Sequence, residues 1–88
     1  MKQSKINDLV ETIIRIGSDS SLMNAFLTDL LTPTEYIEIK KRWEIVKMLD
    51  SSVPQNMIAK KLGVGIATVT RGSRVLRNSK GGFKKMLK

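Results

Sequence analysis

Basic side chains crowd the C-terminal part of this sequence. Residues 51–88 hold nine Lys or Arg and no Asp or Glu, a net charge of +9, whereas residues 1–50 hold seven basic and eight acidic residues. A block of one sign favours a polyanion as partner, either nucleic acid or an anionic membrane surface. The simplest alternative is a solvated tail that binds nothing.

Short polar side chains lie between these charges. On one helix they could enter a major groove, where Thr methyl or Ala groups contact thymine while Arg and backbone amides hold phosphates. A helical hairpin with a polar outer face would explain the apolar residues equally well, but not the absence of acids. The pattern therefore indicates DNA binding. The candidate contacts are Gln55, Asn56, Lys60, Lys61, Gly65, Ile66, Ala67, Thr68, Thr70, Arg71 and Arg74.

The side chains that most often carry catalysis and metal binding are missing. The 88 residues include no Cys and no His, which excludes disulfides, thiol nucleophiles, Cys/His zinc sites and imidazole bases. Ser and Thr residues have no evident base, so they are interpreted as caps and turn formers. We expect neither an enzyme nor a metal site.

Two helices would position the basic residues. Residues 54–63 and 66–77 carry helical apolar spacing on either side of a turn with two glycines. A helix, a glycine-bearing turn and a second helix within about 23 residues is the helix-turn-helix arrangement. Beyond Ser79 we expect only a short terminal helix, anchored by Phe83 and Leu87.

Three further helices are predicted upstream. Residues 4–16 repeat apolar side chains at helical spacing, with Ser4 as a candidate N-cap and Gly17 as the stop. Residues 22–31 are apolar on more than one face, which indicates burial between helices, with a second chain as one source of them. A capping box at Thr32–Glu35 starts a helix that runs to about Asp50. Its single tryptophan, Trp43, is interpreted as a core or interface anchor.

Length and hydropathy set the fold class. A chain of 88 residues buries only about 60% of its unfolded surface, so a second protomer could complete the core. We expect one all-α domain with dimerisation helices at 4–50, the helix-turn-helix at 54–77 and a basic tail at 78–88. No apolar run approaches the roughly 18 residues of a membrane span and no signal-peptide block is present, which predicts a cytoplasmic protein without a membrane partner.

The string GIATVTRGS at residues 65–73, with LTPTE at 31–35 and an arginine at position 42, resembles the bacterial tryptophan repressor family. The resemblance covers residues 22–77. It implies an all-helical, intertwined homodimer that binds palindromic operator DNA and uses L-tryptophan as corepressor. The apolar excess of residues 4–31 agrees independently with a dimer.

The resemblance also implies a pocket for the corepressor. Arg42 and Arg71 would sandwich the indole, a cation–π contact worth about 0.5–2 kcal/mol. Arg71 and the Thr32 hydroxyl would meet the carboxylate, while carbonyls at a helix end would receive the ammonium. The implied set is Asp29, Leu31, Thr32, Arg42, Val46, Arg71, Gly72 and Val75.

Five positions depart from the family pattern. Val75 stands where the family has a serine near the amine, and Asp29 replaces an apolar residue there. Asn56 and Ala59 occupy positions of an arginine that reads guanine and a lysine that meets phosphate, so the operator sequence should differ. Arg74 replaces an asparagine and adds a charge that faces DNA.

Two other functions compete with a ligand-controlled repressor. A ligand-independent regulator of the same superfamily would keep DNA binding; Val75 favours it, whereas the Arg42 and Arg71 pair favours the repressor. A cationic helical protein that binds RNA or anionic membranes through residues 71–88 belongs to another class. The well-formed turn at residues 63–65 argues against it.

Overall fold

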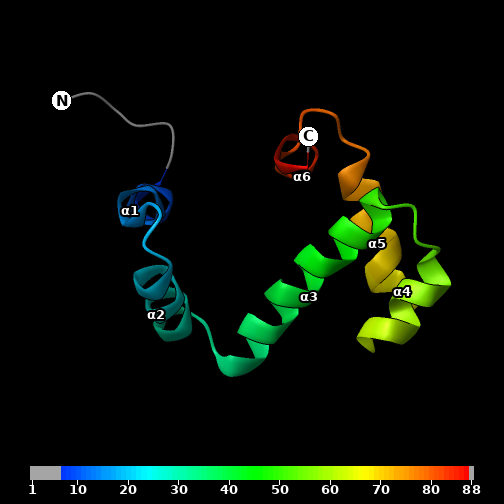
Figure 1. Cartoon of the computed structure of the whole chain (residues 1–88), viewed down its shortest axis with the longest axis horizontal. Coiled ribbons are helices and arrows are strands. Elements are labelled where there is room, and N and C mark those ends of the chain that lie inside the picture. Colours follow the sequence, from blue (N-terminus) through cyan, green and yellow to red (C-terminus); the bar gives the residue numbers. More distant parts are fainter. Residues whose placement is uncertain (1–6, 88) are drawn as a thin grey trace. The chain divides into compact units, whose positions relative to one another are not determined.

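The structure of this chain is a computed structural model that describes residues 7–87, and within that range it contains six α-helices and no strand (Figure 1). The predicted all-α class is confirmed. The chain divides into two compact units between Tyr36 and Ile37. In chain order the helices are α1 (Asp8–Ile16), α2 (Ser20–Leu30), α3 (Pro33–Asp50), α4 (Gln55–Leu62), α5 (Ile66–Leu76) and α6 (Gly82–Met86).

Helix α1 is capped at both ends by its own sequence. The Asn7 side chain accepts a hydrogen bond from the Val10 N–H at 2.8 Å and is the N-cap. The expected cap at Ser4 lies outside the described residues. Gly17 ends the helix with a φ of 63°, a left-handed value that favours glycine, and its N–H donates to the Ile14 carbonyl. The predicted stop at Gly17 is confirmed.

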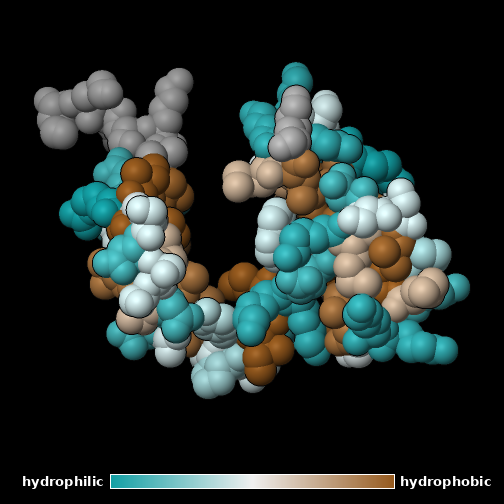
Figure 2. All heavy atoms as spheres, viewed as in Figure 1, coloured by the Kyte–Doolittle hydropathy of each residue, from teal (hydrophilic) through white to brown (hydrophobic). Residues whose placement is uncertain are grey.

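Helix α2 begins at Asp19, whose carboxylate accepts a hydrogen bond from the Leu22 N–H at 3.0 Å. Neither α1 nor α2 contains a buried residue. Several apolar side chains on them are more than one-third exposed, and Figure 2 shows hydrophobic surface over both helices. One chain therefore leaves the apolar faces of α1 and α2 largely uncovered. The exposed residues are Leu9, Val10, Ile14, Leu22 and Leu30.

The capping box that starts α3 is confirmed. The Thr32 N–H donates to Glu35 Oε1 at 2.9 Å, and the Glu35 N–H donates to Thr32 Oγ1 at 3.1 Å. In the same unit the Tyr36 hydroxyl donates a hydrogen bond to the Asn24 side chain on α2. Helix α3 ends at Asp50, as predicted.

The second unit has a small core where α3, α4 and α5 meet. Ile45 and Val46 on α3, Ile58 on α4 and Val69 on α5 are each at most 1% exposed. A three-residue turn joins α4 to α5, and Gly63 in that turn has a φ of 65°. The turn thus requires a left-handed residue where the sequence supplies glycine. The two predicted helices and their turn are confirmed.

The chain ends in the short helix α6. Phe83 and Leu87 are half-buried, in agreement with their predicted role as anchors. The rings of Phe83 and Trp43 lie with their centroids 6.1 Å apart and their planes tilted by 40°. Among the described residues, no helix is long and apolar enough to cross a membrane.

Candidate DNA interface and ligand pocket

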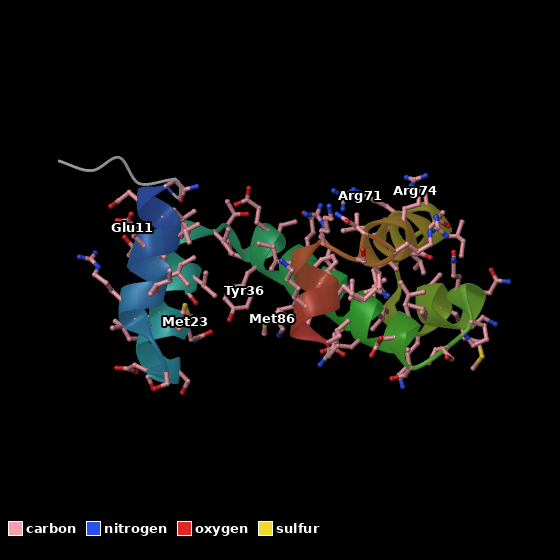
Figure 3. The ribbon with its side chains drawn as sticks, turned by 90° about the horizontal axis from the view of Figure 1, so that it is seen from above. Glu11, Met23, Tyr36, Arg71, Arg74 and Met86 are labelled. Atoms are coloured by element: carbon pink, nitrogen blue, oxygen red, sulfur yellow. The ribbon has the colours of Figure 1, made fainter. Side chains whose placement is uncertain are left out.

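The predicted DNA contacts lie on α4, on α5 and in the turn between them. All are exposed except two half-buried side chains, Gln55 and Thr70. The Thr70 hydroxyl donates to Gln55 Oε1 at 2.9 Å and so joins α5 to α4. Arg71 and Arg74 extend to the same side of α5 (Figure 3). The second unit therefore presents both basic and small side chains to solvent.

The N-terminal end of α5 is suited to a phosphate group. Its N-cap, Gly65, has no side chain, and no side-chain hydrogen bond caps the helix. The first amide groups of a helix lack intrahelical acceptors and carry a partial positive charge, which favours an anion. Ile66, Ala67 and Thr68 on this first turn are all exposed. The N-terminal end of α5 can therefore approach a groove of DNA closely.

Four of the eight predicted ligand residues meet in one place. Arg42, Val46, Arg71 and Gly72 line a cavity of about 110 Å³ between α3 and α5, which we call the arginine hollow. The sequence prediction missed three further residues that line it. They are Ile45, Thr68 and Phe83.

The floor of the arginine hollow is apolar and tightly packed. Ile45 and Val46 are 1% exposed, and Gly72 is buried. A Cβ atom on Gly72 would lie 3.1 Å from Cγ2 of Ile45, so a larger residue here would require Ile45 or α5 to shift. Arg42 and Arg71 are at the rim, and both are exposed. An apolar floor below two guanidinium groups suits a flat ring that carries a carboxylate.

Val75 lies elsewhere. It lines a larger neighbouring cavity of about 640 Å³, the outer hollow, together with Trp43, Gly82, Phe83 and Met86. The structure thus does not bring Val75 together with Arg42 and Arg71 around the arginine hollow. Phe83 is the residue that lines both hollows.

The other three predicted ligand residues belong to the first unit. Asp29 is near the end of α2, Leu31 is its C-cap, and Thr32 follows. The last carbonyls of a helix lack intrahelical donors and attract a cation. The Thr32 hydroxyl accepts from the Glu35 N–H and keeps its own proton for donation. The role of these residues toward a ligand remains a prediction.

An all-helical chain with a helix-turn-helix and an exposed basic face has the features of a DNA-binding protein. Residues 4–88 match the family described as "Trp repressor protein". The chain belongs to this family, whose members are DNA-binding transcriptional repressors and not enzymes. The alternative of an RNA- or membrane-binding cationic protein is set aside by this match.

Curated relatives agree with the family. A "Trp operon repressor homolog" of Vibrio parahaemolyticus is 39% identical over 77 residues, which are 86% of this chain and 75% of the relative. One from Actinobacillus succinogenes is 40% identical over 72 residues (81% and 70%). One from Vibrio cholerae is 45% identical over 75 residues (84% and 69%). No solved structure shows a significant match to the chain.

Proposed function

We propose that this chain represses transcription as a homodimer that binds palindromic operator DNA when L-tryptophan occupies the arginine hollow. The observation that carries the proposal is the convergence of Arg42 and Arg71 over a buried apolar floor. Two cations at the rim of an apolar cavity favour an aromatic amino acid over an aliphatic or a purely anionic ligand. The names of the curated relatives support tryptophan as that amino acid.

The ligand would be held through its indole ring, its carboxylate and its ammonium group. Arg42 and Arg71 would cover the indole faces, with Val46 and Gly72 as the floor, and Arg71 would also pair with the carboxylate. In a dimer, the second subunit would add the Thr32 hydroxyl toward the carboxylate. Its helix-end carbonyls at Asp29 and Leu31 would accept from the ammonium.

The dimer itself is proposed from uncovered apolar surface. No residue of α1 or α2 is buried, and Ile14 and Leu22 are 63% and 51% exposed. Isologous contact between two copies would bury these faces. The predicted dimerisation helices at 4–50, helix-turn-helix at 54–77 and basic tail at 78–88 form part of this proposal.

DNA would be bound by the surface of α4 and α5. Lys60, Lys61 and Arg74 would hold phosphates, which gives affinity without sequence information. Ile66, Ala67, Thr68 and Thr70 would face base edges in the major groove. A repressor of this kind would act in the cytoplasm, and the proposal needs no membrane partner.

Tryptophan would act by orienting α5. Arg71 would belong to the ligand site and to the DNA-facing helix at once, because it lines the arginine hollow and extends from the same side of α5 as Arg74 (Figure 3). A bound ligand would then favour a spacing of the two α5 helices near that of successive major grooves, about 34 Å. Coupling between two such sites is ordinarily about 5- to 150-fold in affinity.

The test is a titration of operator DNA with the purified protein. The operator is first selected from a random duplex library in about 1 mM L-tryptophan, a saturating level for a micromolar dissociation constant. Wild type and Arg42→Ala are then titrated with and without the amino acid. We expect tryptophan to tighten operator binding by the wild type about 5- to 150-fold and to leave the variant unchanged. If the wild type binds the operator equally well with and without L-tryptophan, the corepressor function is wrong and the ligand-independent regulator replaces it.

A further inference from the structure

Phe83 stands between the arginine hollow and the outer hollow. We propose that its ring is a gate: in the ligand-free chain it occupies part of the space that the ligand's ring needs, and binding displaces it. This inference rests on the proposed corepressor function and adds to it a residue that limits ligand affinity.

The arginine hollow is too small for the ligand's ring as its walls stand. Its volume is about 110 Å³. An engineered protein cavity of about 150 Å³ accepts benzene, and an indole adds a second fused ring to benzene. An indole that reaches the floor therefore needs more room than the present walls leave.

The floor is not the wall that moves. Ile45 and Val46 are 1% exposed and belong to the C-terminal half of α3. Gly72 already packs so closely that a Cβ atom would meet Ile45 at 3.1 Å. Arg42 and Arg71 lie at the rim, where the proposed function requires them to stay over the ring faces. Phe83 is the remaining bulky wall.

The segment that carries Phe83 is short and has no side-chain cap. Helix α6 has five residues and no side-chain N-cap, whereas isolated helices shorter than about 12 residues are marginal in water. Gly81 and Gly82 lie at its start, and glycine gives a backbone more freedom than any other residue. The Phe83 ring is held by its contact with Trp43, at 6.1 Å between centroids.

The outer hollow can receive the displaced ring. Its volume is about 640 Å³, and Trp43, Val75 and Met86 line it with apolar side chains. Phe83 already forms one of its walls. Moving the ring away from Gly72 into this space would enlarge the arginine hollow and keep the ring beside apolar side chains. The free energy needed to break the present contacts of Phe83 would be subtracted from the free energy of ligand binding, so the wild type would bind the ligand more weakly.

The first test is calorimetry of L-tryptophan binding by the full chain. Phe83→Ala removes the ring, and it should bind L-tryptophan about 2- to 12-fold more tightly than wild type, the range that corresponds to one aromatic pair contact. Phe83→Leu keeps an apolar anchor for α6 without a ring, and it should also bind more tightly. Lys85→Ala is the matched control on α6. Lys85 is exposed and lines neither hollow, so this variant should bind like wild type.

The second test follows Trp43, the only tryptophan of the chain. In protein labelled with nitrogen-15 it gives one indole N–H signal, and unlabelled ligand adds none. Displacement of Phe83 removes the ring that lies beside Trp43. Saturating L-tryptophan should therefore shift this signal in the wild type, and the shift should be much smaller in Phe83→Ala, where no ring is left to move.

The outcomes separate this inference from the proposed function. Tighter binding by Phe83→Ala and Phe83→Leu, with Lys85→Ala unchanged, supports the gate. If wild type binds L-tryptophan and both Phe83 variants bind equally or more weakly, the gate is wrong while the corepressor function stands. Binding by the variants alone would support the gate and show that the wild type does not use this corepressor. No binding by any of the chains would overturn both proposals.

Discussion

The Thr70 hydroxyl on α5 donates a hydrogen bond to Oε1 of Gln55 on α4, at 2.9 Å and in a partly buried setting. The bond joins the two helices at the surface proposed to face DNA. It also gives the two polar side chains fixed roles, because the Gln55 oxygen is occupied and its amide N–H groups remain as donors. An oriented donor at this point can contact a phosphate, or the N7 and O6 acceptors of guanine.

Thr70→Val should therefore lower both stability and sequence preference. Loss of one intramolecular hydrogen bond costs about 0.5–1.5 kcal/mol of unfolding free energy, measured by urea denaturation. The ratio of operator to random-duplex affinity should fall, because Gln55 loses its orientation. A double-mutant cycle supplies the control: in a Gln55→Ala background the same Thr70 substitution should have almost no further effect on stability. Additive effects would show that the contact contributes nothing.

Gly72→Ala should destabilise the second unit and weaken tryptophan binding. The new Cβ atom would lie 3.1 Å from Cγ2 of Ile45, a core side chain that is 1% exposed. Overpacking costs about 1–3 kcal/mol, against a gain of about 1 kcal/mol from better helix propensity. A net loss of up to about 2 kcal/mol should appear in the urea midpoint.

Gly82→Ala is the control for this substitution, because a Cβ atom there meets nothing within 4 Å. It should leave the midpoint unchanged or slightly raised. Ligand calorimetry on both variants then separates the two glycines, since Gly72 alone lines the arginine hollow. Unchanged stability of Gly72→Ala would mean that α5 can move away from α3 at little cost.

Local signals in the sequence predicted most of the fold, because caps and turns depend on neighbouring residues. The capping box at Thr32, the stop at Gly17 and the left-handed turn at Gly63 are all present. Helix α1 begins at Asp8 with Asn7 as its N-cap. The apolar stripe reaches back to Ile6 and favours a cap at Ser4, which lies outside the described residues.

The candidate site was predicted only in part, because its remaining residues meet through tertiary packing. The resemblance placed Arg42 and Arg71 correctly around one hollow. No spacing in the sequence indicates that Phe83, on a separate short helix, would line the same hollow. The Thr70 and Gln55 pair likewise joins residues fifteen positions apart, and its bond depends on how α4 packs against α5.

Ile14→Asp should disrupt the proposed dimer. Ile14 is 63% exposed in a single chain, and a carboxylate on that face would be buried without a partner in a dimer, which is strongly unfavourable. Sedimentation at low micromolar concentration should show a dimer for wild type and a smaller or unfolded species for the variant. Ser21→Asp adds the same charge at an exposed polar position on α2 and should remain dimeric. A folded, cooperative wild-type monomer would contradict the proposal.

DNA affinity should depend steeply on salt, because residues 51–88 contain nine basic residues and no acid. If a dimer binds about six or more phosphates, affinity should fall about a thousandfold or more between 50 and 200 mM salt. Lys60→Ala or Lys61→Ala should weaken binding to all DNA sequences about equally and reduce the salt slope by about one for each phosphate that the variant no longer neutralises.

Lys47 is the matched control, since its ammonium pairs with Glu44 at 2.9 Å and it lies outside the proposed interface. Lys47→Ala should keep the wild-type slope in a filter-binding or anisotropy series. A flat salt dependence in the wild type would remove phosphate binding as the source of affinity, and an equal change for Lys47 and Lys60 would show that total charge, rather than the surface of α4 and α5, governs binding.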